Sequence, residues 1–439
     1  MSTTRKVGAG RLAAFGGMTL LGVPALAAAQ DATPAINGAD TAWMLIAAAL
    51  VLLMTPALAF FYGGLVRSKN ALNTMMMSVI SLGFVGVLWA LFGYSLAFGP
   101  GNNWIGDTSR FFLNGVTLDP QGTIPHVLFM AFQGTFAIIT AALISGAIVE
   151  RMRFSAYVAF ISLWALLVYS PIAHWVWGGG WLADWGALDF AGGTVVHVNA
   201  AVAALVAAIV VGKREDYPST QLLPHNVPFT LLGAGLLWFG WFGFNAGSAL
   251  AANQIAGLAF VTTMFAPAAT LVVWAFLDMV RSGKPTAVGA ATAIVVGLVA
   301  VTPAAGFISP LSAIALGAIA AVPSYFALQW RARTSLDDSL DVVAAHGVGG
   351  TVGALLTGVF AQKSLNGLAD GALFGNPGQL AVQLMAILAA IVFSGVMSFI
   401  LLKAISVVVP LRAAINDEAS GLDISMHGEE AYLHSDGSH

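Results

Sequence analysis

Cysteine is absent from the 439 residues of this chain, and charged side chains are scarce. Without cysteine the chain can form no disulfide and has no thiolate nucleophile or cysteine-ligated metal site. Asp, Glu, Lys and Arg together supply 8% of the residues, whereas a soluble domain typically carries about 25%. So few charges exclude an ordinary soluble surface. The net charge of −3 says little about partners, and we expect no nucleic-acid partner.

Long apolar runs take the place of the missing charges. Hydrophobic residues make up 58% of the chain, and they recur in runs of about 20 residues, the length of a membrane-spanning helix. The strands of a membrane β-barrel would instead be about 10 residues long, with alternating polar and apolar positions. The sequence therefore predicts an all-α polytopic membrane protein.

We predict eleven transmembrane helices. They lie near residues 41–64, 71–98, 125–149, 154–173, 193–211, 227–247, 253–277, 286–303, 307–328, 339–360 and 379–402.

The first thirty residues, MSTTRKVGAGRLAAFGGMTLLGVPALAAAQ, are typical of a secretory signal peptide. A basic start precedes a short apolar stretch and a small-residue cleavage site, which we place near Ala29. The alternative, an additional uncleaved span, is disfavoured because the apolar stretch is short. Residues 1–30 are thus predicted to be removed. A membrane domain would follow over 31–402 and a cytoplasmic tail over 403–439.

The basic residues predict the orientation of the chain. With the mature N-terminus outside, twelve of the 17 Lys and Arg residues fall in inner loops or the tail, and two, Arg110 and Lys363, fall outside. Positive charge collects on the cytoplasmic side of membrane proteins. The predicted topology is therefore N-out and C-in.

Two histidines lie inside predicted spans, His197 in GTVVHVNAAVAAL and His346 in DVVAAHGVGGTVGALL. Each heads a face of small residues at offsets 3, 4 and 7, which are alanines in the first case and glycines in the second. The two spans run in opposite directions. We therefore predict an inverted repeat of five plus five helices with one extra, in which the two rings meet near the bilayer centre.

A buried histidine pair has three interpretations. Hydrocarbon favours neutral imidazole, which both donates and accepts hydrogen bonds and can therefore handle a small polar passenger. The pair could instead act only as interhelical glue. Metal binding is disfavoured because no clear third ligand lies nearby. Ionisable residues inside a membrane are functional candidates by default, and we favour the first interpretation.

Aromatic residues at helical spacing accompany the histidines. Phe132 and Phe136 are four residues apart, and Trp241 and Phe244 are three apart, with Ser248 one turn further on. Aromatic faces attract cations, by about 2 kcal/mol when desolvated. The alternative is an interfacial aromatic belt.

The segment AHWVWGGGWLADWGALDF carries four tryptophans and Asp189 at the predicted outer boundary. For Trp181 and Trp185 the belt interpretation is the better one. Asp189 directly precedes a helix, so it could cap that helix or favour a cation at the outer mouth. The residues alone do not separate these two roles.

Several long motifs resemble the ammonium transporter (Amt/Mep/Rh) family, in its bacterial Amt branch. They are FFYGGLVRSKN, ISGAIVERMRFSAY, AHWVWGGGWLADWGALDFAGGTVVHVNAA, GWFGFNAGSA, AAHGVGGTVGALLTG and GLDISMHGEEAY. Together the resemblance runs from about residue 41 to residue 432.

The resemblance implies ammonium uptake across the inner membrane by a homotrimer of eleven-helix protomers, with no cofactor and no enzymatic activity. It implies a recruitment site at Phe136, Trp177 and Ser248, supported by Asp189, and a gate of Phe136 and Phe244. Phe132 and Trp241 would line the vestibule, and His197 and His346 would be the twin histidines of the pore. Ammonia would cross, with net proton transfer. The tail resembles the region that docks PII-type signal proteins.

Three alternatives stay open. One is an ammonium sensor or transceptor, disfavoured because only a short tail follows the last predicted span. Another is an electroneutral ammonia channel. The third is a Rh-like gas channel, disfavoured because the outer aromatic and hydroxyl residues suit a cation.

Overall fold

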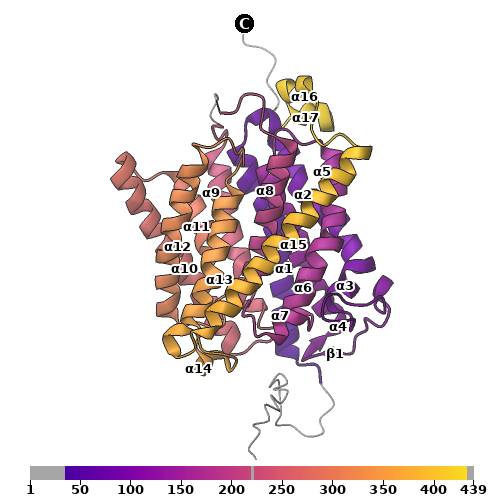
Figure 1. Cartoon of the computed structure of the whole chain (residues 1–439), viewed down its shortest axis with the longest axis vertical. Coiled ribbons are helices and arrows are strands. Elements are labelled where there is room, and N and C mark those ends of the chain that lie inside the picture. The colour runs from indigo at the N-terminus through magenta and orange to yellow at the C-terminus, as the bar shows by residue number, and fades with distance from the viewer. Residues whose placement is uncertain (1–34, 219–221, 433–439) are drawn as a thin grey trace, which may run out of the picture.

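Helices form nearly all of the structure, a computed structural model that describes residues 35–218 and 222–432. They stand side by side in one upright bundle, with the small helices α16 and α17 at one end and α14 and the β1 strand at the other (Figure 1). The predicted signal peptide, residues 1–30, lies outside the described residues.

The helices follow the predicted spans closely. The α-helices are α1 (Gly38–Leu65), α2 (Ala71–Leu88), α3 (Tyr94–Phe98), α4 (His126–Leu143), α5 (Phe154–Trp164), α6 (Ser170–Trp177), α7 (Trp181–Asp184), α8 (Asn199–Val211), α9 (Val227–Trp241), α10 (Gln254–Ser282), α11 (Ala287–Val301), α12 (Pro310–Arg331), α13 (Gly349–Phe360), α14 (Lys363–Asn366), α15 (Gly378–Val408), α16 (Ile415–Ser420) and α17 (Leu422–His427). A short antiparallel pair, β1 (Pro120–Gln121) and β2 (Ile124–Pro125), precedes α4.

Within the described residues, ten continuous helical stretches are long and apolar enough to cross a bilayer, and α11 is a shorter apolar helix. The prediction of an all-α, multi-pass membrane protein is confirmed. The number eleven and the N-out/C-in orientation stay predictions, and the two ends of the bundle are named below according to that orientation.

Among the described residues, five short segments have the wider turn of a π-helix. They are η2 (Trp89–Gly93), η5 (Ala165–Tyr169), η6 (Gly193–Val198), η7 (Phe242–Ala246) and η8 (Val343–Val348). The segments η6 and η8 lead directly into α8 and α13, and η7 directly follows α9. Such π-turns insert one extra residue into a helix and occur often at functional sites.

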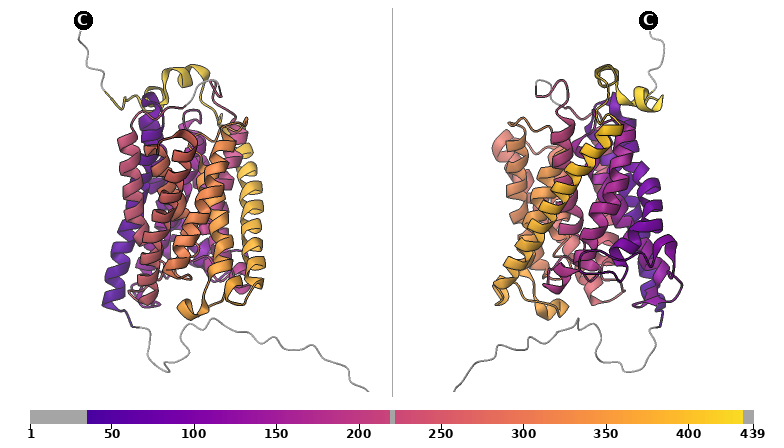
Figure 2. Two further views of the ribbon diagram at one scale, coloured as in Figure 1. Left: turned by 90° about the vertical axis from the view of Figure 1, so that its left-hand side faces the viewer. Right: turned by 45° about the vertical axis from the view of Figure 1, so that its right-hand side comes forward.

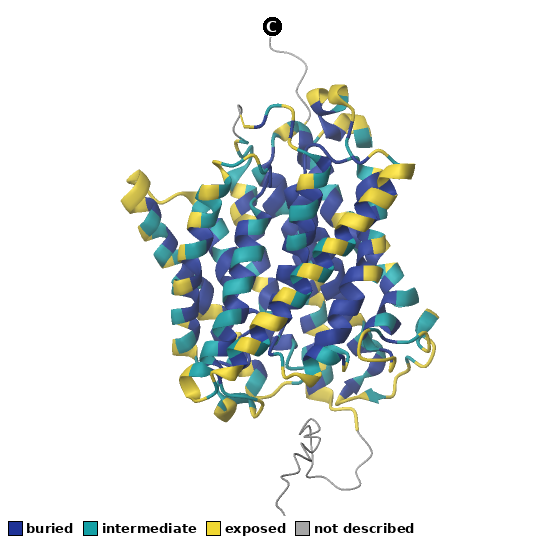
Figure 3. Cartoon of the chain, in the orientation of Figure 1, coloured by how far each residue is buried: buried dark blue, intermediate teal, exposed yellow. Residues whose placement is uncertain are grey.

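Burial divides the bundle into a central group of helices and a lipid-facing rim (Figure 3). In the most apolar stretch of the α4 span 83% of the residues are buried, against 33% for α15. The long helix α15 crosses the outside of the bundle at a slant, as Figure 1 and the right-hand view of Figure 2 show. The core that positions the histidines is therefore built from the central helices.

Glycines allow the central helices to approach closely. A Cβ on Gly353 of α13 would lie 2.1 Å from the carbonyl oxygen of Ala300 on α11, and one on Gly350 would lie 3.1 Å from the Cβ of His197. The two predicted small-residue faces are buried, as tight packing requires. Their members are Ala200, Ala201, Ala204, Gly349, Gly350 and Gly353.

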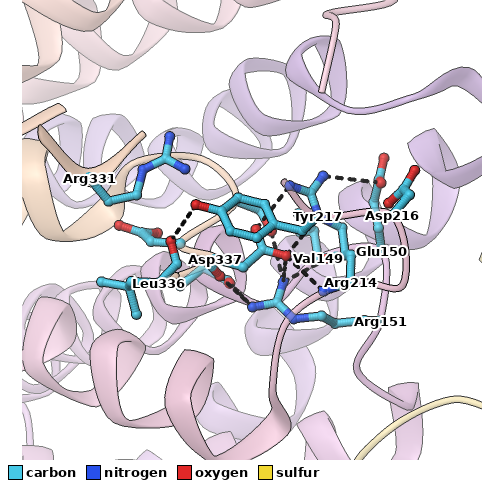
Figure 4. Close-up of polar contacts among 12 residues, drawn as sticks. Val149, Glu150, Arg151, Arg214, Asp216, Tyr217, Arg331, Leu336 and Asp337 are labelled. Carbon is cyan, nitrogen blue, oxygen red and sulfur yellow. Dashed lines mark hydrogen bonds and ion pairs between the residues drawn. The ribbon is translucent and has the colours of Figure 1, made fainter. Parts of the chain in front are cut away.

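An ionic network joins the loops at the cytoplasmic end (Figure 4). Arg214 donates to both carboxylate oxygens of Asp337 at 2.9 Å, and Arg67 pairs with Glu150. The side chain of Arg151 is fully buried and donates to the carbonyl oxygens of Gly212 and Asp337. Several of the basic residues that predicted the orientation thus also hold the loops together.

The C-terminal segment packs on this same end of the bundle. The carboxylate of Asp423 accepts the backbone N–H groups of Leu72 and Asn73, which begin α2, and Asn70 accepts the N–H of Leu422. Tyr432 hydrogen-bonds His225 at 2.9 Å. The tail is therefore docked on its own chain as far as residue 432.

Candidate functional site

His197 and His346 meet in the core. Their Nδ1 atoms are 3.1 Å apart and their ring centroids 5.2 Å apart, and only 1% and 3% of the two residues is exposed. His197 lies on η6 and His346 on η8, so both rings project from π-turns. The predicted encounter of the two histidines is observed.

The short Nδ1–Nδ1 distance restricts the protons of the pair. A hydrogen bond between these atoms needs a proton on one and a lone pair on the other. If both rings are neutral, the accepting ring carries its proton on Nε2, and the donating ring has a bare Nε2. The pair therefore offers one donor and one acceptor to a passenger.

Asp189 holds the turn that carries His197. Its Oδ1 accepts the N–H groups of Gly192 and Gly193 at 2.9 and 2.6 Å, and its Oδ2 accepts those of Thr194 and Val195 at 2.9 and 3.0 Å. Burial raises the pKa of Asp189, and the four amide hydrogen bonds oppose that rise. The capping interpretation is confirmed. A direct role in attracting a cation stays a prediction.

Asp338 holds the second turn in the same way. It accepts the N–H groups of Val342 and Val343 at 3.1 and 2.7 Å, at the start of η8. We did not predict a site role for Asp338 from the sequence. The sequence does contain a pattern that could have identified it, because Asp338 precedes His346 by eight residues, just as Asp189 precedes His197. The two halves of the predicted repeat thus share an aspartate-capped turn and a histidine.

Apolar side chains enclose the histidine pair. A cavity of about 10 Å³ beside the rings is lined mainly by such residues, among them Leu58, Ile139 and Val295. A cavity of roughly 10–15 Å³ holds about one water molecule. The buried Nε2 of His197 has no hydrogen-bond partner among the described residues. The site therefore combines space for one small molecule with an unsatisfied polar atom.

Phe244 lines this cavity and packs against a second phenyl ring, that of Phe136. The rings of Phe136 and Phe244 have centroids 4.2 Å apart and are tilted by 33°, and Phe132 packs on Phe136 at 5.0 Å. His197 stacks on Trp241 at 5.5 Å and on Phe244 at 6.0 Å. The structure thus brings the predicted gate, vestibule and pore residues into one continuous column.

Trp177 lies at the outer end of the column. Its ring meets Phe136 edge-on with centroids 6.0 Å apart, and its Nε1 donates to the carbonyl oxygen of Asp189 at 2.9 Å. Ser248 lies one turn beyond Phe244, and its hydroxyl donates to the Phe244 carbonyl oxygen at 2.8 Å. With its proton engaged, the Ser248 oxygen can act only as an acceptor toward a ligand.

The remaining tryptophans of the outer segment do not join the column. Trp181 packs against Trp185 and Trp104, and Trp185 is 55% exposed. This exposure fits the predicted interfacial belt. Trp175 is buried against Phe393 of α15.

A much larger cavity opens on the cytoplasmic side of the pair. It measures about 610 Å³ and reaches from His346 to charged residues at the inner surface, among them Arg214, Arg331 and Asp341. The space on this side of the histidines is therefore large and partly polar, whereas the space beside the histidine rings is small and apolar. In residues 35–218 and 222–432, no cluster of three or more His, Asp or Glu side chains could hold a metal ion.

Comparison with known proteins gives a consistent result. The sequence profile of the Ammonium Transporter Family matches residues 42–432. The ammonium transporter of Bacillus subtilis is 49% identical over 401 residues, which cover 90% of this chain and 99% of that protein. The ammonium transporter of Aquifex aeolicus is 48% identical, covering 90% of this chain and 94% of that protein. These relatives are transporters, not enzymes.

Solved structures agree with the sequence comparison. The crystal structure of Saccharomyces cerevisiae Mep2 superposes with a TM-score of 0.82 at 35% identity, covering 87% of this chain and 88% of that one. A structure named Sensor Amt Protein superposes with a TM-score of 0.83 at 31% identity, covering 89% of this chain and 98% of that one.

Proposed function

This chain belongs to the ammonium transporter family of multi-pass membrane proteins, and from that premise we propose that it takes up ammonium by binding the ion outside and passing ammonia through the histidine pore. The observation that carries this proposal is the buried histidine pair beside an apolar cavity of about 10 Å³. An apolar passage of that size favours a small neutral molecule over an ion.

Recruitment takes place at the outer end of the column. Ammonium would lie against the faces of Phe136 and Trp177, with the oxygen of Ser248 as an acceptor. Cation–π attraction of up to about 2 kcal/mol in a desolvated site supports this assignment. Asp189 contributes negative charge behind Trp177, to which it is joined through its carbonyl oxygen.

Selectivity follows from deprotonation at the gate. Potassium is similar to ammonium in size, so pore width alone would separate them poorly. Transfer of an intact ion into an apolar passage costs many kcal/mol. Ammonium avoids this cost by losing a proton and crossing the Phe136–Phe244 gate as ammonia, whereas potassium has no proton to lose.

The histidines serve the neutral molecule and its proton. Ammonia can accept a hydrogen bond from one Nε2 and donate one to the other, which matches the donor and acceptor that the pair offers. We propose that the proton also crosses, along the histidine pair, so that transport is electrogenic.

Current measurements on purified protein in liposomes test this function. After an ammonium jump we expect a transient current that potassium does not evoke and that decays faster at higher protein density. Loss of that current in His197→Ala and His346→Ala, with folded protein, would locate the proton step. A change of internal pH without current would instead indicate an electroneutral ammonia channel.

A sensor is the second candidate, because the fold superposes closely on the structure named Sensor Amt Protein. Liposomes distinguish the two functions. A sensor would produce neither the current nor the pH change in vesicles that contain correctly folded protein.

We further propose a homotrimer in the inner membrane whose cytoplasmic end binds a PII-type signal protein. The docked tail supports this, because residues 422–432 form part of the cytoplasmic surface. Deletion of residues 421–439 is expected to abolish PII binding in a pull-down, whereas deletion of 433–439 alone is expected to preserve it. Binding that survives the longer deletion would overturn the PII assignment.

A further inference from the structure

Gln383 is a buried polar residue on the slanted helix α15. It lies near the outer end of that helix, and only 1% of it is exposed. Its side-chain amide lies between the loop that leads to Asp189 and the helix α13, which continues from the turn that carries His346. The amide therefore contacts both halves of the histidine site from behind.

Every hydrogen-bonding position of the Gln383 amide is filled. Its Oε1 accepts the backbone N–H of Leu188 at 2.8 Å and an N–H of Gln379 at 3.2 Å. Its Nε2 donates to the carbonyl oxygens of Leu188 at 2.7 Å and of Ala354 on α13 at 3.0 Å. A carboxamide has two N–H donors and an oxygen that accepts twice. Methionine and glutamate have a similar length, but neither can make this set of bonds.

The two bonds to Leu188 hold the residue directly before Asp189. Gln383 pairs with both the N–H and the carbonyl oxygen of Leu188, so this part of the main chain cannot rotate without breaking two buried hydrogen bonds. Asp189 in turn holds Trp177 through its carbonyl oxygen, and it holds the turn of His197 through its carboxylate. The placement of Leu188 therefore affects both the outer site and the pore.

The loop around Leu188 has backbone hydrogen bonds on either side. Ala187 donates to a carbonyl oxygen of α7, and Phe190 donates to the carbonyl oxygen of Pro303. The side chain of Leu188 belongs to an apolar cluster with residues of α11 and α12. Gln383 completes this arrangement, because it bonds the main chain between the two backbone anchors.

Two serines attach the same helix to the bundle elsewhere. Ser394 donates to the carbonyl oxygen of Asn199 at 2.9 Å, and Ser398 accepts the Nε1 of Trp164 at 3.1 Å. Both bonds are buried, but neither touches the loop that leads to Asp189. Gln383 thus differs from these anchors of α15 in the segment that it holds.

We propose that Gln383 is a positioning residue of the transport site, which holds the main chain at Leu188 so that Asp189 keeps both the outer site and the η6 turn in place. Through Ala354 it also joins this loop to α13. Its effect on transport rests on the proposed function, whereas its effect on the loop and the turn does not. Removal of the amide loosens the η6 turn and weakens ammonium capture together.

Amide hydrogen exchange of the full chain, followed by mass spectrometry, tests the holding role without transport. Gln383→Met keeps the length of the side chain and removes its donors. We expect residues 190–198, which include the η6 turn, to exchange about tenfold faster than in wild type, the equivalent of about 1.4 kcal/mol. Ser398→Ala removes a different anchor of α15 and should leave this segment unchanged.

A second variant keeps the exchange test decisive if Gln383→Met does not fold. Gln379→Met removes one donor to the Gln383 oxygen and the bond to the carbonyl oxygen of Gly186. We expect a smaller acceleration over the same residues. Exchange of residues 190–198 that is no faster than in Ser398→Ala would overturn the proposal, whatever the protein transports.

Liposome currents test the positioning role in transport. In Gln383→Met we expect the half-saturating ammonium concentration to rise about fivefold, the equivalent of about 1 kcal/mol, and the maximal current to fall because the turn of His197 is loosened. In a Trp177→Leu background the first effect should disappear, because Trp177 is the residue through which it acts, while the second should persist. An unchanged half-saturating concentration, or the same fold-change in both backgrounds, would refute positioning through Trp177. A wild type without current would instead refute the proposed function, and the exchange experiment would still decide whether Gln383 holds the turn.

Discussion

Single residues show why a carboxylate is needed ahead of the first histidine. Asp189 accepts four amide N–H groups with two oxygens. An asparagine has one acceptor oxygen and directs an NH₂ group at the remaining donors. The orientation of His197 therefore depends on a charged cap that a neutral side chain of the same shape cannot replace.

We expect Asp189→Asn to unfold more readily and to lose ammonium current. Two buried donors would lose their partners at a cost of about 1–3 kcal/mol each. Thermal unfolding followed by tryptophan fluorescence, together with liposome currents, checks both effects. Asp184→Asn, at an exposed position on α7, is the control and should behave as wild type. Equal melting of the two variants would contradict the capping argument.

In the proposed outer site, Trp177 would supply an aromatic face to the ammonium ion. Replacement by leucine removes up to about 2 kcal/mol of cation–π attraction, so the half-saturating ammonium concentration should rise roughly 10- to 30-fold. Liposome currents recorded over a range of ammonium concentrations measure this half-saturating concentration. Trp185→Leu, in the exposed belt, should change little. An unchanged concentration dependence in Trp177→Leu would count against a cation-binding mouth.

Most side chains of the aromatic and histidine column could be identified from the sequence. Helical spacing and resemblance together selected the phenyl, tryptophan and histidine residues that the structure places in contact. They did not predict that the histidines meet through their Nδ1 atoms, because ring orientation depends on backbone geometry that spacing does not encode.

The positions of the helices were predicted well from the sequence. Their local backbone geometry was not. The expected span 41–64 corresponds to α1, Gly38–Leu65, and the span 193–211 ends where α8 ends. The π-turns were not predicted. Spans that are apolar on all sides show no amphipathic periodicity, so one extra residue in a turn leaves no trace in the pattern. Three of these turns carry His197, Phe244 and His346.

The close contact between α13 and α11 makes Gly353 sensitive to substitution. A Cβ at Gly353 would lie 2.1 Å from the Ala300 oxygen, so Gly353→Ala must push α13 away from α11. We expect a loss of roughly 1–3 kcal/mol, as for other overpacked cores. Gly257→Ala on α10, with nothing within 4 Å of the new Cβ, should be neutral or stabilising. Melting temperatures of the two variants measure the difference. If Gly353→Ala has the same melting temperature as the wild type, the two helices can separate at no cost and the prediction is wrong.

Across the whole molecule, the cytoplasmic network links distant loops and the tail. Burial alone would raise the pKa of Asp337, but Arg214 and Arg151 hold it below its ordinary value of 3.8. Burial in turn lowers the pKa of Arg151 to about 10. The ionised form of Asp337 thus stabilises the fold above its ordinary pKa, and this contribution is lost as the pH falls below it.

We therefore expect Asp337→Asn to be less stable than wild type by roughly 3–5 kcal/mol near neutral pH, because it leaves buried arginines without their partner. The difference should shrink as the pH falls below 3.8, where wild-type Asp337 also loses its charge. Melting curves at neutral and acidic pH test this. Glu429→Gln, at an exposed position in the tail, serves as the control. A difference that is independent of pH would exclude the charge as its cause.

The overall architecture was predictable because a bilayer permits few solutions. Long apolar runs must be helices, and the basic loops indicate their direction. The docking of the tail was not specified in detail. It depends on single hydrogen bonds such as that of Asp423 to the start of α2, which no periodic pattern encodes.

The contrast between the two cavities also determines where the membrane voltage acts. The inner cavity of about 610 Å³ is wide enough to fill with electrolyte and so shares the potential of the cytoplasm, whereas the space at the histidines, about 10 Å³, is too narrow for electrolyte. The transmembrane field would therefore fall mainly on the part of the protein that lies outward of His346. A charge that crosses this part experiences most of the voltage, worth about 2.3 kcal/mol per 100 mV. A resting potential that is negative inside would thus drive inward any proton that accompanies ammonia.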